Sequence, residues 1–79
     1  MARFTMRLYL ANCSAVGRGH TCTDAMKQAL IQYAVHSGGC HEKAARTLAT
    51  TARAARRGGV GEVKWKIEDG PNWVEVERC

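Results

Sequence analysis

With 79 residues, the chain is long enough for one small domain, residues 1–79, but its core is too small to enclose a sizeable substrate pocket. Hydrophobic residues make up 46% of the sequence, so we expect it to fold rather than stay disordered. Twelve lysines and arginines against seven aspartates and glutamates give a net charge of +5 at pH 7, which favours an anionic partner.

The first residues do not form a secretory signal, because no apolar segment follows them. The sequence also has no apolar run near the roughly 18 residues that span a membrane. We therefore expect a cytoplasmic protein without a membrane partner. In that reducing compartment the four cysteines are expected to be free thiols. They are Cys13, Cys22, Cys40 and Cys79.

Residues 3–10 alternate between polar and apolar side chains, which predicts a half-buried strand. Its apolar side consists of Phe4, Met6, Leu8 and Leu10. Residues 11–20 are expected to form a loop, because glycine, serine and asparagine interrupt them repeatedly. A short additional strand inside this segment is an alternative that the pattern leaves open.

The first predicted helix begins after Thr21, a typical N-cap residue, and ends at the glycines that follow Ser37. Its packing face consists of Cys22, Met26, Ala29, Leu30 and Tyr33. Ile31 and Val35 fall on the opposite side. A helix that is apolar on two sides usually contacts two surfaces, so we predict a homodimer contact through Ile31 and Val35.

The second predicted helix, residues 41–57, combines a small apolar face with a basic flank. The apolar face consists of Ala45, Leu48, Ala49, Ala52 and Ala55. The basic stripe consists of Lys43, Arg46, Arg53 and Arg57, which span about 21 Å of one helical edge. Glu42 is expected to point away from it. The stripe predicts a docking edge for phosphates or for an acidic protein surface, and a solvated helix face is the alternative.

Residues 62–68 and 73–78 alternate again on either side of a strong turn signal, so they predict a hairpin with Glu68 opposite Trp73. The same register pairs Ile67 with Val74, Trp65 with Val76, Lys66 with Glu75, and Lys64 with Glu77. Each apolar or opposite-charge pair contributes about 0.2–1 kcal/mol. A slip by one residue would turn the apolar side chains to water.

The predicted fold is therefore an α+β two-layer sandwich of order β-α-α-β-β. It has a three-stranded antiparallel sheet with two helices on one face, and the strand after the helices lies beside the first strand. The other face of the sheet would carry Arg3, Arg7, Tyr9, Lys64, Lys66, Trp73, Glu75 and Glu77. The aromatic side chains of such a face could stack on nucleic-acid bases. We favour the alternative, a solvated face whose charges cancel in pairs, because the last strand carries acidic residues.

Catalytic and metal chemistry find little support in the sequence. Cys22 and His36 would lie about 21 Å apart at opposite ends of one helix, too far to share a zinc ion. A thiol at Cys22 activated by His20 lacks an orienting acid. The segment Gly17–Thr21 lacks the Lys-Ser/Thr end of a phosphate-binding loop. We expect no metal, no cofactor and no enzyme activity.

The hairpin segment Glu68–Val74 (Glu-Asp-Gly-Pro-Asn-Trp-Val), shortly before Cys79, is similar to the closing hairpin of one inhibitor of type I CRISPR systems. The chain also resembles small phage-borne anti-CRISPR proteins in size and element content, and its Ala- and Arg-rich helix resembles inhibitors of type I-C systems. The resemblance implies a non-enzymatic, stoichiometric inhibitor in the bacterial host cytoplasm. Such an inhibitor binds protein subunits of the RNA-guided Cascade complex and blocks target DNA. The family shares no functional motif, so it assigns no residue.

The net charge of +5 argues against mimicry of DNA, because such complexes hold DNA in positive channels. We therefore expect the basic stripe to dock on acidic residues of the effector and to bind free nucleic acid only weakly. Two alternatives belong to other classes: a small basic nucleic-acid-binding phage protein and an antitoxin-like interaction module.

Overall fold

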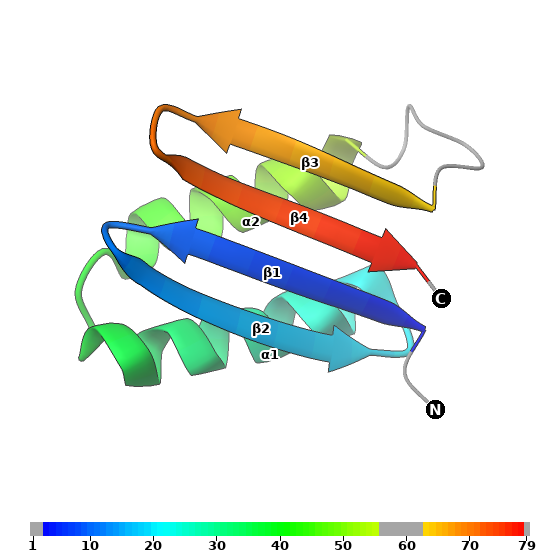
Figure 1. Ribbon diagram of the computed structural model, residues 1–79. Coiled ribbons are helices and arrows are strands. Elements are labelled where there is room, and N and C mark those ends of the chain that lie inside the picture. Colours follow the sequence, from blue (N-terminus) through cyan, green and yellow to red (C-terminus); the bar gives the residue numbers. More distant parts are fainter. Residues whose placement is uncertain (1–2, 56–62, 79) are drawn as a thin grey trace.

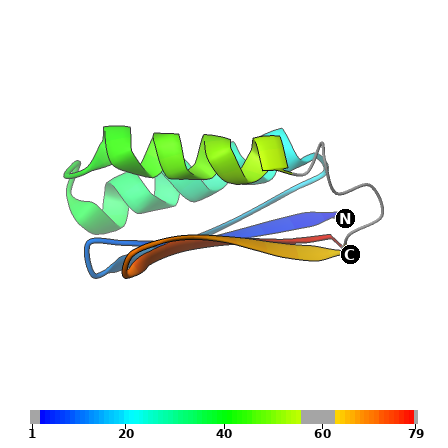
Figure 2. The ribbon, with the colours of Figure 1, turned by 90° about the horizontal axis from the view of Figure 1, so that it is seen from above.

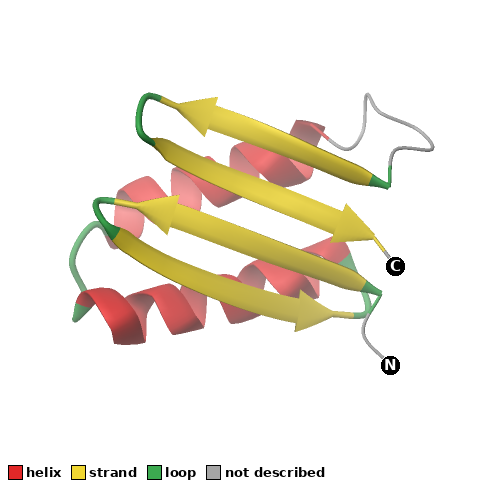
Figure 3. Cartoon of the chain, viewed as in Figure 1, coloured by secondary structure: helices red, strands yellow, loops and turns green. Residues whose placement is uncertain are grey.

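The computed structural model has a four-stranded antiparallel sheet with both helices packed on one face (Figures 1 and 2). It describes residues 3–55 and 63–78. The elements are β1 (Phe4–Leu10), β2 (Cys13–Gly19), α1 (Cys22–Ser37), α2 (Glu42–Ala55), β3 (Lys64–Asp69) and β4 (Asn72–Arg78). The strand order is β2-β1-β4-β3, so β2 and β3 form the two edges (Figure 3). The predicted α+β class is confirmed, with four strands instead of three.

The prediction of a loop at residues 11–20 was wrong, and the alternative of an additional strand in this segment is confirmed by β2. Ala11 and Asn12 form a two-residue turn between β1 and β2, with φ angles of 51° and 65°. Two positive φ angles in succession suit a tight hairpin, because they match the twist of the flanking strands. The chain uses no glycine in this turn, so the usual sequence signal of a hairpin is missing.

Gly17, which suggested a loop, is instead required for packing. A Cβ atom at this position would collide with the backbone of Ala25 and Ala29 on α1. The glycine therefore lets α1 lie directly on β2. The side chains of Ala25 and Ala29 are fully buried at this contact, which shows how closely the two elements approach.

The neighbour of β1 was also predicted wrongly, because β4 rather than β3 pairs with it. The element order is β-β-α-α-β-β, with Leu8 opposite Val74. The side chains of the last two strands suit a central position for β4 and an edge position for β3. Val74 and Val76 of β4 are fully buried in the middle of the sheet. β3 carries exposed charges, including Lys64 and Lys66, which protect a sheet edge from unwanted pairing.

The β3–β4 hairpin has the predicted register, with Glu68 opposite Trp73 and Trp65 opposite Val76. Trp65 lies on the helix-covered face, is 9% exposed, and donates a 2.9 Å hydrogen bond from Nε1 to the carbonyl of Ala52 on α2. Trp73 is half-buried on the open face. The hairpin therefore anchors α2 through one tryptophan and presents the other.

The core lies between the helices and the inner face of the sheet. Phe4, Met6, Leu8 and Leu10 are all buried, as predicted. The helices contribute mainly small side chains, which allow close packing. Ala55 was predicted to join them but is exposed, because no described element covers the last position of α2.

The ends of α1 are fixed as the sequence predicted. The Thr21 hydroxyl accepts a 3.0 Å hydrogen bond from the amide of Asp24, and Gly38 adopts the left-handed conformation with φ of 68°. Near the same C-terminal end, the Tyr33 hydroxyl donates a 2.8 Å hydrogen bond to the Leu10 carbonyl. This bond joins the buried ring of α1 to the end of β1.

Candidate interaction surfaces

The structure places the members of the predicted basic stripe in different surroundings. Lys43 lines a groove between α2 and β3, whereas Arg46 lines one between α1 and α2. Arg53 is half-buried and donates a 3.2 Å hydrogen bond to the Thr23 hydroxyl. Arg57 lies outside the described residues. Lys43 and Arg46 form no ion pair within the part of the chain that the structure describes.

Glu42 was predicted to point away from the basic stripe, and this prediction was wrong. It lines the same groove as Arg46, because residues four apart on a helix are neighbours. The two side chains do not come within ion-pair distance. The carboxylate lowers the local positive potential, but Arg46 remains an exposed residue.

The α1–α2 groove combines this exposed cation with exposed aliphatic side chains. It encloses about 220 Å³ and is lined by Leu30, Ile31, Ala34, Glu42 and Arg46. Ile31 is 54% exposed and Val35 is 69% exposed. Both lie on the solvent side of α1, as their helical positions predicted. Large aliphatic side chains with this exposure mark a surface that a partner can cover.

A larger groove lies between α2 and the β3–β4 hairpin and was not found from the sequence. It measures about 1010 Å³, with Leu10, Leu48 and Ile67 among its lining residues. Its charged lining residues have both signs, and they are Glu42, Lys43, Glu68 and Asp69. Its lining residues come from three separate segments of the chain, so no local pattern could have brought them together. The mixed charges favour no single class of ionic ligand.

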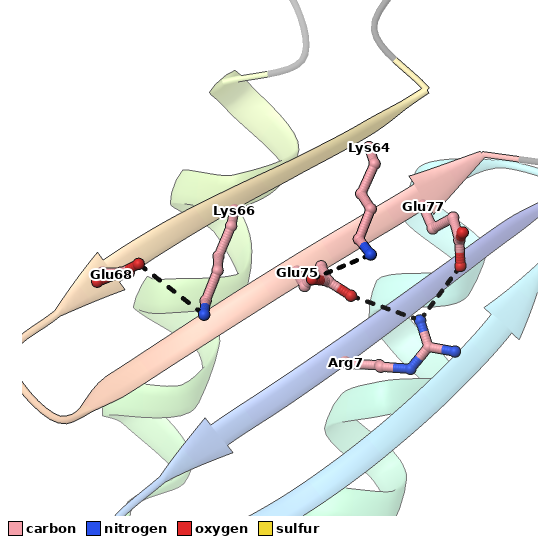
Figure 4. Close-up of polar contacts among 6 residues, drawn as sticks. All are labelled: Arg7, Lys64, Lys66, Glu68, Glu75 and Glu77. Carbon is pink, nitrogen blue, oxygen red and sulfur yellow. Dashed lines mark hydrogen bonds and ion pairs between the residues drawn. The ribbon is translucent and has the colours of Figure 1, made fainter.

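The outer face of the sheet carries a network of paired charges (Figure 4). Arg7 approaches Glu75 at 3.7 Å and Glu77 at 3.4 Å. Lys64 pairs with Glu75 at 3.7 Å and Lys66 with Glu68 at 3.9 Å. The predicted register of the β3–β4 hairpin is correct, but its lysines form other ion pairs: Lys64 reaches Glu75 diagonally, and Lys66 pairs with Glu68 on its own strand. Arg7 pairs with Glu75 directly across β1 and β4 and with Glu77 diagonally. The positive and negative charges of this face largely cancel, as expected from the acidic residues in its sequence.

An aromatic pair lies at one end of the same face. The rings of Tyr9 and Trp73 stack with centroids 6.0 Å apart and an interplanar angle of 18°. The Lys66 Nζ lies 4.9 Å from the Trp73 ring centroid, within reach of a cation–π attraction. Tyr9 lies opposite Trp73 across β1 and β4. The pair therefore follows from the strand order, which the sequence did not determine.

The described residues offer no assembled metal centre. They contain no group of three or more His, Cys, Asp or Glu side chains that could hold a metal ion. Cys22 is 4% exposed, so the nucleophile considered from the sequence is a buried residue. Burial, together with the nearby Cys13 and Cys40 thiols, raises the pKa of the Tyr33 phenol.

Among the described helices, none has the length and apolar content needed to cross a bilayer.

Comparison with known proteins adds no further constraint. No family model, curated protein or solved structure matches this chain. The geometry of these surfaces is therefore the basis for a proposed function.

Proposed function

We propose that this protein is a non-enzymatic binding protein that docks on an acidic patch of a protein partner through the α1–α2 groove. The observation that supports this proposal is a contrast between the two layers. Every ion pair among the described residues lies on the outer face of the sheet. On the helix layer, Arg46 is exposed, makes no ion pair with a described residue, and lines the same groove as the exposed Ile31.

An unpaired arginine beside an aliphatic side chain suits a protein interface. Arginine is enriched at such interfaces because its planar guanidinium binds carboxylates through two hydrogen bonds while its stem packs on apolar groups. Ile31 would supply apolar area beside this charged contact. The groove is too small to hold a macromolecular segment, so it would receive single side chains of the partner.

The resemblance to small anti-CRISPR proteins supplies the expected partner, the protein subunits of a type I Cascade complex. The bound inhibitor would block the engagement of target DNA. The net charge of +5 favours docking on exposed acidic residues over occupation of the positive DNA channel. Arg53 also faces α1, where it bonds to Thr23, and would add positive charge on that side of α2. Lys43 lines the groove on the other side of α2, so it would not take part in this contact.

Binding of the purified protein to type I Cascade tests this proposal by biolayer interferometry. Arg46→Glu should weaken binding at least about tenfold, because a reversed charge adds repulsion as well as removing attraction. Ile31→Glu should weaken it similarly and leave the fold intact, since Ile31 is exposed. Arg3→Glu is the matched control: it makes the same charge change on another exposed residue and should bind normally.

A plaque assay in a host with an active type I system measures the biological consequence. The wild-type protein and Arg3→Glu should protect an invading phage, whereas Arg46→Glu should not. If Arg46→Glu and Ile31→Glu both bind and protect normally, the α1–α2 groove is only a solvated surface.

Nucleic-acid binding is the second candidate function, and the stacked Tyr9–Trp73 pair with Lys66 is the observation that favours it. Bases stack on exposed aromatic rings. However, Glu75 and Glu77 lie on the same face and would repel phosphates. Tight binding of labelled DNA near physiological salt without a protein partner, lost in Trp73→Ala, would favour this candidate. If the four cations of the basic stripe bound phosphates of duplex DNA instead, the logarithm of the binding constant would fall with the logarithm of the salt concentration with a slope of about −3.6.

The predicted homodimer contact through Ile31 and Val35 can be measured in the same preparations. This contact competes with the docking proposed above, because both would cover Ile31. If the dimer forms, light scattering should show a dimer mass for the wild-type protein and a folded monomer for Ile31→Glu, because a charge would be stranded at the contact; Ile31 would then belong to a second copy rather than to the effector. A monomer mass for the wild-type protein would contradict this prediction and leave both side chains available to another partner.

A further inference from the structure

β2 is an edge strand with backbone hydrogen-bonding groups that face away from the sheet. The Arg3 amide donates a 3.0 Å hydrogen bond to the Gly19 carbonyl, so Gly19 directs its backbone toward β1. Because this direction alternates along a strand, Ser14, Val16 and Arg18 direct theirs outward. The Ser14 carbonyl is 2.8 Å from His36 Nδ1. The backbone groups of Val16 and Arg18 form no hydrogen bond within the described part of the chain.

The two edges of the sheet differ in how well they are protected. Exposed Lys64, Lys66 and Glu68 follow one another along the outer side of β3, and a row of charges discourages strand addition. β2 has one charged side chain, Arg18, and presents Val16 with 40% exposure. The β2 edge is therefore the more favourable position for another strand.

A groove runs along this edge and has room for an extended segment. It measures about 540 Å³ and is lined by Ser14–Arg18 together with Gln28, Gln32 and His36 of α1. In the view of Figure 1, the C-terminal half of α1 projects past β2, which gives the groove a helical wall. The two glutamine amides can donate to and accept from a peptide backbone or polar side chains.

The chemistry of the groove indicates what would occupy it. Free outward N–H and C=O groups on alternate residues are matched by another extended backbone. Arg18 gives the groove a positive charge, and none of the lining residues is acidic. Across an antiparallel pair, an acidic side chain opposite Arg18 and an apolar one opposite Val16 would be the favourable neighbours.

We propose that the β2 edge binds an extended acidic segment of a partner protein as a fifth, antiparallel strand. The segment would carry a carboxylate opposite Arg18 and an aliphatic side chain opposite Val16. A second copy of this chain fits less well, because its own β2 strand offers no carboxylate to Arg18. This site lies on a different surface from the α1–α2 groove and does not depend on the function proposed there.

A synthetic peptide, Ser-Thr-Glu-Thr-Val-Thr-Ser-Thr with blocked ends, tests the site by NMR titration. On binding, the amide hydrogens of Val16 and Arg18 should exchange at least about tenfold more slowly, because they become hydrogen-bonded. Replacing the glutamate of the peptide by lysine should weaken its binding about fivefold or more. No binding up to about 1 mM, or binding without protection of these two amides, would overturn the proposal.

Proline substitutions provide a matched pair of variants. Val16→Pro removes an outward N–H from one edge and should abolish peptide binding, because proline is tolerated on edge strands but cannot donate a hydrogen bond. Lys66→Pro makes the same change on the β3 edge and should bind the peptide normally. Equal loss in both variants would overturn the assignment to β2. A dimer that forms at assay concentrations, excludes the peptide and is lost in Val16→Pro would instead assign this edge to a second copy.

Discussion

Removal of the Trp65 side chain should be the most damaging single change in the β3–β4 hairpin. Trp65 is 9% exposed and fills the space between β3 and the last turn of α2. Its Nε1 donates a 2.9 Å hydrogen bond to the Ala52 carbonyl. Trp65→Ala would therefore remove apolar packing and leave a buried carbonyl without this donor.

The expected loss is large for so small a domain. Tryptophan-to-alanine changes in cores cost about 3–5 kcal/mol, and the lost hydrogen bond accounts for about 1 kcal/mol of such a loss. A 79-residue domain has a total stability of about 4–12 kcal/mol. Urea denaturation followed by circular dichroism should show Trp65→Ala partly or fully unfolded before denaturant is added. Trp65→Phe retains a ring, so it should lose less.

Trp73→Ala is the matched control, because the same side chain is removed from the opposite face of the same hairpin. Trp73 is half-buried, and its described ring contacts are the stack on Tyr9 and the approach of Lys66. We expect a loss of about 1 kcal/mol, in the range of an aromatic pair. A larger loss for Trp73→Ala than for Trp65→Ala would refute the assignment of the two faces.

Gly17→Ala should destabilise the fold by about 1–3 kcal/mol, because its Cβ would force α1 away from β2. Gly70→Ala is the control in a thermal melt, because its Cβ would meet no neighbouring atom. It should lower the free energy of unfolding by only about 1 kcal/mol, the cost of a positive φ angle for alanine. A smaller effect for Gly17→Ala than for Gly70→Ala would contradict the close contact between α1 and β2. Burial raises the pKa of Tyr33, so its neutral form stabilises the fold. Unfolding free energy should be retained below about pH 10 and fall as pH rises through the folded-state pKa. Tyr33→Phe should remove part of that fall in urea denaturation between about pH 9 and 11, and an unchanged pH dependence would contradict this role.

Local patterns in the sequence were sufficient wherever one face of an element is buried. Alternation in residues 3–10 identified the buried side of β1, and the paired side chains of the last hairpin determined its register. Both succeed because a slip of one residue would expose an entire apolar face. Thr21 and Gly38 likewise mark the ends of α1 through hydrogen bonds made within a few residues.

β2 was predicted only as an alternative to a loop, because its residues suit packing against α1 more than they favour a strand locally. Gly17 weakens a strand locally, but it allows the backbone of α1 to approach the sheet closely. The turn at Ala11 and Asn12 also lacks the glycine that usually marks a hairpin with positive φ angles. The signal that remained was a weak alternation of small and polar residues from Cys13 to Gly19.

Sequence patterns were sufficient to predict two helices and three of the four strands with approximate bounds, and most of the residues that these elements bury. The pairing of β4 with β1, the resulting contact of Tyr9 with Trp73, and the positions of Lys43 and Arg46 in different grooves became known only from the fold. The difference has a physical reason. The periodic pattern of apolar residues and the helix caps involve residues close in sequence. Strand order and grooves depend on contacts between distant segments. Local side-chain periodicity does not encode those contacts.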